Sequence, residues 1–278
     1  MNLANLFWST SGLYILGWFI CNLSFFHIRK NLHKIGEFTL FMGLVLHVIY
    51  IGIQFFRPNS SPFTTIAGIL LFTSLLTSTI YFILDYLYRK EIFEIIFPPL
   101  TLFFLLLSSL ISNQTLLVPQ FITVSPIAGK SMIYIHASFS LIGYLLFGVA
   151  CLTSIFFLKL EQKIKNKTLL LQDIKVPSLG FLDRLNHRVI TSGFLFLTIG
   201  LLMGITVNLI VKQGFTSINL RLIFPILTWG FYAFVLFDRS IRGLSGRFTA
   251  TWSIIGFIAA AFSFIYEMII LTHSTPKL

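Results

Sequence analysis

Histidines are the side chains of this chain best suited to chemistry, because imidazole binds metal ions and exchanges protons near neutral pH. Three of the six histidines fall within or at the end of long apolar stretches, namely His47, His136 and His273. An ionisable group at membrane depth is costly to insert, so each of the three is a candidate site. His187 and Glu267 lie closer to a polar boundary, where their side chains could reach water.

Two histidines on different helices at the same membrane face could supply both axial ligands of a heme iron. His136 and His273 are the candidate pair, and the 32 Phe residues of the chain would suit an apolar macrocycle. The alternative for either residue is a hydrogen bond at the membrane interface, and for His47 a hydrogen bond to a neighbouring helix. His27 and His33 lie in a basic segment and are expected to be solvated.

The composition is that of a membrane protein. Of the 278 residues, 56% are hydrophobic and only 10% are charged, with a mean hydropathy of +0.90. Soluble domains carry about 25% charged residues, so a water-soluble enzyme is excluded. The two cysteines, Cys21 and Cys151, lie in apolar runs and form neither a disulfide framework nor a metal motif.

The elements that must position these histidines are predicted transmembrane helices. Such a helix needs about 20 mostly apolar residues to cross the hydrocarbon core. The chain divides into eight apolar runs at 5–26, 37–56, 66–84, 92–112, 131–158, 189–211, 221–237 and 248–271. The predicted fold is therefore an all-α integral membrane protein, a bundle of about eight transmembrane helices in a single membrane domain over residues 1–278.

The positions of the basic residues predict the orientation. Most of the 20 Lys and Arg residues fall in alternate connections, around 27–34, 85–91, 159–188 and 238–247. Basic connections face the cytoplasm, so both termini are predicted to lie outside, and 159–188 is predicted to be the main cytoplasmic loop. This bias and contact with anionic lipid account for the net charge of +11, so nucleic acid is not an expected partner.

The motif search points to binding rather than to catalysis. The chain has no Ser–His–Asp set, no HExxH, no Walker loop and no Rossmann glycine fingerprint, so we expect no enzyme. Gly200 and Gly204 form a GxxxG pattern, which favours close packing between helices.

The second half of the chain resembles a known family. The segments SMIYIHASFSLIGY, LDRLNHR with GFLFLTIGLLMG, and LTWGFYAFVLF with the basic residues after it carry the resemblance. They are similar to the cytochrome c assembly proteins, the CcsA-like and HemX-like multi-span membrane proteins. The likeness covers the core 130–273 well and the half 1–129 less sharply. The stretch KQGFTSINLRLIF lacks the family's Trp-rich, acid-containing signature, which makes the HemX-like branch the closer match.

The resemblance implies a heme held non-covalently near the outer membrane face. His136 and His273 occupy the positions of the family's two flanking histidines and would be the metal ligands. His47 and Trp229 are further candidates for contact with the cofactor, and Phe215 and Glu267 are possible supporting residues.

The predicted function is that of a heme-handling accessory protein in cytochrome c assembly, in a bacterial cytoplasmic (inner) membrane. Its partners would be heme, other assembly proteins and the bilayer. One alternative is a regulatory protein that controls an enzyme of tetrapyrrole synthesis through the loop 159–188, where Asp183, Arg184 and His187 cluster. A second alternative is a small-solute transporter or a lipid-modifying membrane enzyme.

Overall fold

The described residues are almost all helical, and none of them lies in a strand. The computed structural model describes residues 3–27, 30–56, 65–111, 128–168, 177–212, 220–243 and 246–273. The helices in these ranges are α1 (Leu3–His27), α2 (Lys30–Phe55), α3 (Ile66–Tyr88), α4 (Ile92–Ile111), α5 (Ala128–Lys165), α6 (Leu179–Lys212), α7 (Leu220–Arg242) and α8 (Arg247–His273). Among the described residues, all of them except α7 contain a stretch long and apolar enough to cross a membrane. The predicted all-α membrane fold is confirmed, whereas the orientation with both termini outside stays a prediction.

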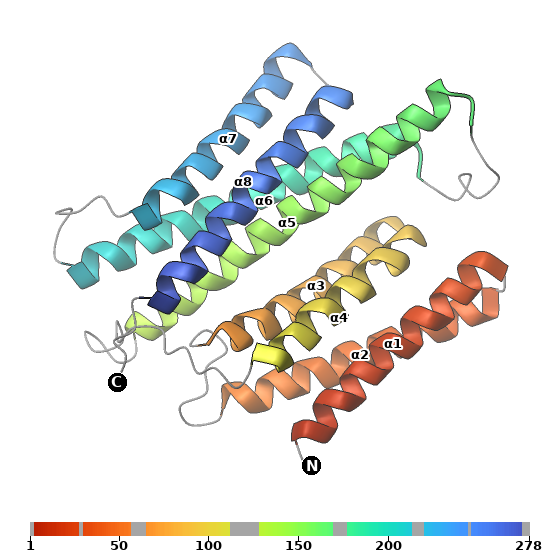
Figure 1. Ribbon diagram of the computed structural model, residues 1–278, viewed down its shortest axis with the longest axis horizontal. Helices are drawn as coiled ribbons and strands as arrows, with labels where there is room; N and C mark the ends of the chain where they lie inside the picture. Colours follow the sequence, from red (N-terminus) through yellow and green to blue (C-terminus); the bar gives the residue numbers. More distant parts are fainter. Residues whose placement is uncertain are drawn as a thin grey trace. The chain divides into compact units, whose positions relative to one another are not determined.

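The helices form two compact units, Met1–Leu117 and Val118–Leu278. In the first unit α1 packs against α2 and α4, and α3 packs against α4 and α2. In the second unit α5 and α6 form the most extensive pair, α8 lies along α5, and α7 contacts α6 and α8 (Figure 1). Each unit is thus a bundle of four helices.

Small residues bring α5 and α6 into close contact. A Cβ atom added at Gly143 of α5 would lie 3.0 Å from the backbone nitrogen of Leu197 and 3.1 Å from the carbonyl oxygen of Gly193, both on α6. The two backbones therefore touch directly, the arrangement that helices use in a membrane where dispersion contacts replace the hydrophobic effect.

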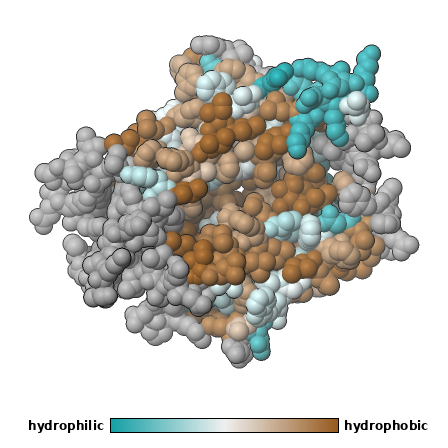
Figure 2. All heavy atoms as spheres, viewed as in Figure 1, coloured by the Kyte–Doolittle hydropathy of each residue, from teal (hydrophilic) through white to brown (hydrophobic). Residues whose placement is uncertain are grey.

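The lipid-facing character of the bundles is visible on their surfaces. Large apolar side chains stay exposed, including Trp8 (62%), Leu110 (79%) and Phe237 (65%), and apolar residues dominate much of the visible described surface (Figure 2). Many buried hydroxyls donate to a carbonyl in the preceding turn of their own helix, as where Thr10 donates to the carbonyl of Leu6 at 2.8 Å. This pattern is expected where lipid is the solvent, because every polar group must find its partner inside the protein.

The connection between α5 and α6 is shorter than the predicted loop 159–188. Helix α5 continues to Lys165 and α6 begins at Leu179, so both ends of the predicted loop are helical. Backbone hydrogen bonding continues through polar residues once a helix has formed, and the Glu161–Lys165 ion pair, 2.6 Å long at i,i+4 spacing, supports the extension. The cytoplasmic placement of 159–188 stays a prediction, and residues 169–176 within it lie outside the described residues.

Candidate functional site

His136 lies near the start of α5 and contacts the backbone of α6. Its Nδ1 atom lies 2.6 Å from the carbonyl oxygen of Gly200. A carbonyl oxygen only accepts hydrogen bonds, so Nδ1–H is the donor, and in the neutral imidazole Nε2 then carries the lone pair. Nε2 is then the ring nitrogen available to a metal ion.

The two glycines of the GxxxG pattern provide the space for this contact. A Cβ added at Gly204 would lie 2.7 Å from Cε1 and 2.9 Å from Nδ1 of His136. One added at Gly200 would lie 3.0 Å from the backbone nitrogen of Ser140, one turn further along α5. The expected close packing at Gly200 and Gly204 is confirmed, and the absence of side chains at these glycines leaves the space that the His136 ring occupies.

The environment of His136 fits the heme iron that the family resemblance implies. A histidine that binds a metal ion usually donates its other ring N–H to a carbonyl or carboxylate, which fixes the tautomer and the direction of the ring. The bond from His136 to Gly200 is of this kind, and the His136 residue is half-buried rather than fully enclosed.

The second predicted ligand, His273, ends α8. Its side chain and those of Glu267 and Phe215 lie outside the described residues. Helices α5 and α8 run antiparallel, because the hydroxyl of Tyr144 lies 3.4 Å from that of Ser263, and a Cβ at Gly148 would lie 3.2 Å from the ring of Phe257. This register brings His136, in the third turn of α5, level with the last turn of α8.

Trp229 attaches α7 to α6. Its indole Nε1 donates to Thr198 Oγ1 at 2.9 Å, and its ring stacks on Phe194 with a centroid distance of 5.4 Å. Thr198 and Gly200 are two residues apart on α6, which separates their directions by about 200° around the helix axis. Trp229 and His136 therefore contact different faces of α6.

His47 lies in the first unit and is fully buried, with 0% of its surface exposed. Its Nδ1 lies 3.3 Å from the hydroxyl of Tyr14 on α1, and its Nε2 lies 3.2 Å from that of Ser74 on α3. Tyr14 in turn donates to Ser78 at 2.9 Å. Both ring nitrogens of His47 are thus engaged, and binding to iron would require one of these contacts to break.

Replacing His47 with Phe should destabilise the protein without removing heme. The variant leaves the buried hydroxyls of Tyr14 and Ser74 without their ring partner, at an expected cost of about 1–3 kcal/mol. Thermal unfolding in detergent measures the loss of stability, and absorbance measures heme per chain. A folded His47→Phe protein that no longer binds heme would identify His47 as a ligand instead.

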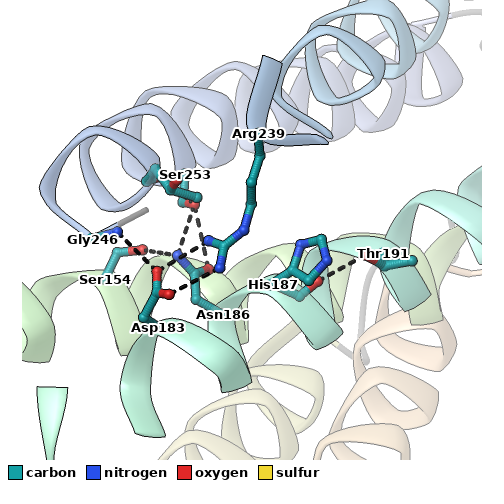
Figure 3. A network of polar contacts seen from close by, with 9 residues as sticks. Ser154, Asp183, Asn186, His187, Thr191, Arg239, Gly246 and Ser253 are labelled. Atoms are coloured by element: carbon teal, nitrogen blue, oxygen red, sulfur yellow. Dashed lines mark hydrogen bonds and ion pairs between the residues drawn. The ribbon is translucent and has the colours of Figure 1, made fainter. Parts of the chain in front are cut away.

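At the end of the second unit far from His136, a network of polar contacts links α5, α6, α7 and α8 (Figure 3). Asp183 at the start of α6 accepts two hydrogen bonds from Arg239 of α7, at 3.0 and 2.9 Å, and a third from the backbone N–H of Gly246 at 2.9 Å. Gly246 has φ of +77°, a conformation that favours glycine at this turn into α8. Asp183 is thus engaged within the fold rather than presented to a partner.

Asn186 extends this network to α5 and α8. Its Nδ2 donates to Ser154 at 3.1 Å and to Ser253 at 3.2 Å, and the hydroxyl of Ser253 lies 3.3 Å from Asn186 Oδ1. Asn186 and Gly200 are about 21 Å apart along α6, from the rise of a helix. The network therefore holds the bundle together far from His136.

The prediction that His33 is solvated is wrong. His33 Nε2 lies 2.8 Å from Glu94 Oε1, and His33 Nδ1 lies 3.5 Å from Glu37 Oε2. Glu94 is only 2% exposed. The sequence carried a signal for this cluster, because Glu94 stands inside the apolar run that forms α4 and therefore needs a partner.

Comparison with known proteins agrees with the resemblance in the second half and extends it. Residues 63–270 match the family described as Cytochrome C assembly protein. A cytochrome c biogenesis protein CcsA of Trieres chinensis is 24% identical over 265 residues, which cover 85% of this chain and 84% of that protein. A CcsA protein of Guillardia theta is 24% identical over 251 residues, which cover 82% of this chain and 80% of that protein. One from Synechococcus sp. (strain CC9902) is 32% identical over 95 residues, 34% of this chain and 31% of that protein.

These relatives carry the CcsA name, and the closer likeness to the HemX-like branch stays a prediction. The matched region contains both the contact between His136 and Gly200 and the network around Asp183. Because that region spans most of the sequence, the chain belongs to the cytochrome c assembly protein family.

Proposed function

We propose that this protein binds heme non-covalently near the outer membrane face and passes it on during cytochrome c biogenesis, without an enzymatic step of its own. The observation that carries the proposal is the 2.6 Å contact between His136 Nδ1 and the carbonyl oxygen of Gly200, which leaves Nε2 for iron. Family membership and the CcsA relatives support the role in cytochrome c biogenesis.

His136 and His273 are the proposed axial ligands. The antiparallel register of α5 and α8 supports this pairing, because His136 and the last turn of α8 are level with each other. Bound heme would supply an iron that two neutral imidazoles can coordinate. The protein would contribute the direction of the His136 ring, through Gly200, and apolar helix surfaces beside the macrocycle.

Heme titration of the detergent-purified protein tests the proposal. The wild type should bind one heme per chain with a Soret band, and His136→Ala and His273→Ala should each weaken binding at least about 10-fold. His187→Ala is the matched control, because His187 is also a half-buried histidine of the second unit but lies beside the Asp183 network. A wild type that takes up no heme, or that binds it as tightly after both substitutions, would refute the proposal.

The partners that fit this function are heme and other cytochrome c assembly proteins. The bacterial cytoplasmic membrane as the host membrane stays a prediction.

A further inference from the structure

The cluster of His33, Glu37 and Glu94 lies in the first unit and plays no part in the proposed heme site. His33 and Glu37 stand at i,i+4 spacing near the start of α2 and so share one face of that helix. Glu94 comes from the first turn of α4. Each of the three residues offers one nitrogen or oxygen atom, and these atoms all lie within 4.8 Å of one another.

Close helix packing holds these residues together. A Cβ added at Gly36 of α2 would lie 2.5 Å from Cys21 Sγ and 3.1 Å from the Cys21 backbone nitrogen, so α1 and α2 touch beside the cluster. Helix α1 also packs against α4, and the thiol of Cys21 lies beside Glu94. The positions of the three candidate ligands are therefore set by contacts among α1, α2 and α4.

The Oε1 atom of the buried Glu94 carboxylate has an ion-pair partner but no hydrogen bond in the part of the chain that the structure describes. The Glu94 side chain is 3% exposed, and its Oε1 lies 2.8 Å from His33 Nε2 without the geometry of a hydrogen bond to any described residue. The hydroxyl of Tyr81 is also buried, with the residue 2% exposed, and has no hydrogen-bond partner among the described residues. Tyr81 lies within electrostatic range of Glu94, so a second buried oxygen without a hydrogen bond to a described residue lies in the same part of the first unit.

The local charges favour a cation. Glu37, Glu94 and the half-buried Asp85 carry formal negative charges within electrostatic range of one another. His33 and Arg89 are the groups that oppose them there. Even with His33 protonated, these three carboxylates outnumber His33 and Arg89, and the one that is buried, Glu94, is costly to keep charged unless it is paired or binds a metal ion.

We propose that His33, Glu37 and Glu94 bind a divalent transition-metal cation such as Zn²⁺ at the junction of α2 and α4. One imidazole and two carboxylates suit Zn²⁺, a borderline cation, and Mn²⁺, which favours oxygen ligands. Bonds to zinc are about 2.0–2.2 Å long, so ligand atoms around one ion lie up to about 4 Å apart. A small inward movement of side chains would bring the three atoms into that range.

Cobalt binding to the full-length protein tests this site directly. The detergent-purified chain is stripped with a chelator and titrated with Co²⁺, whose visible absorption bands report coordination, and Zn²⁺ is then added as a competitor. One Co²⁺ per chain, displaced by one Zn²⁺, is the expected result. Glu37→Gln and His33→Ala should each weaken binding at least about 10-fold.

Glu91→Gln is the matched control, because Glu91 is an exposed carboxylate three residues before Glu94. Thermal unfolding shows whether each variant is folded. Zn²⁺ should raise the unfolding temperature of the wild type and of Glu91→Gln, but not that of Glu37→Gln. A stable wild type that binds no Co²⁺ or Zn²⁺, or a Glu37→Gln protein that binds as the wild type does, would overturn the proposal. In that case the cluster is an ion pair of His33 with the two carboxylates.

Discussion

Gly204→Ala should weaken heme binding about 10-fold to 100-fold while the protein stays folded. The added methyl group would lie 2.7 Å from Cε1 and 2.9 Å from Nδ1 of His136, so the ring must move and its bond to Gly200 is lost. Removing the group that orients a metal-binding histidine typically costs this factor in affinity. Alanine is also a better helix former than glycine, by about 1 kcal/mol, so the loss would not come from an unstable α6.

Heme titration followed by absorbance measures this effect, with Gly230→Ala as the matched control. Gly230 lies in α7 of the same unit, and a Cβ there would meet nothing within 4 Å. The control should bind heme as the wild type does. Equal heme affinity in Gly204→Ala and the wild type would show that the packing of His136 against Gly200 and Gly204 does not orient its ring for heme binding.

Asp183→Ala should strongly destabilise the protein, because Asp183 ties the start of α6 to α7 and to the turn before α8. The substitution removes two charge-assisted hydrogen bonds from Arg239 and one from Gly246, and it leaves the guanidinium of Arg239 without its counter-charge. Breaking one side of a buried pair costs about 3–5 kcal/mol. Because the two side chains keep 17% and 15% exposure, we expect a loss of about 2–3 kcal/mol.

Unfolding in mixed detergent gives the free energy of Asp183→Ala, of Arg239→Leu and of the double variant. The coupling between the two single substitutions should exceed about 1 kcal/mol, because the residues share a bidentate contact. Glu161→Gln is the control, since it breaks the more exposed Glu161–Lys165 pair and should cost less than about 0.5 kcal/mol. Additive effects of Asp183→Ala and Arg239→Leu would contradict this account of the network.

The sequence alone was sufficient to predict the helical membrane fold. A run of about 20 apolar residues has few structural alternatives in lipid, so each predicted span corresponds to a helix. The helix ends were less predictable. Helix α5 continues to Lys165 and α6 begins at Leu179, both beyond the apolar runs. A helix can continue past the membrane wherever its polar residues tolerate the helical backbone conformation. Hydropathy does not report this tolerance.

The candidate ligand His136 was predictable because an ionisable residue in an apolar run is unusual. The contact of His136 with Gly200 could not be predicted, because it depends on how α5 and α6 are aligned. That alignment is set by tertiary packing at residues such as Gly143. The same reason explains the wrong prediction for His33. The basic residues around it suggested solvation, whereas the packing of α2 and α4 against α1 brings Glu94 to the His33 ring.

The absorption spectrum of His136→Gly with and without free imidazole tests most directly whether His136 binds heme iron. Heme-loaded wild type, reduced with dithionite, should show the sharp α and β bands of a six-coordinate heme. His136→Gly should lose them, and added imidazole should restore them by occupying the space of the missing ring. A reduced spectrum of His136→Gly identical to that of the wild type, without imidazole, would contradict the assignment of His136 as an axial ligand.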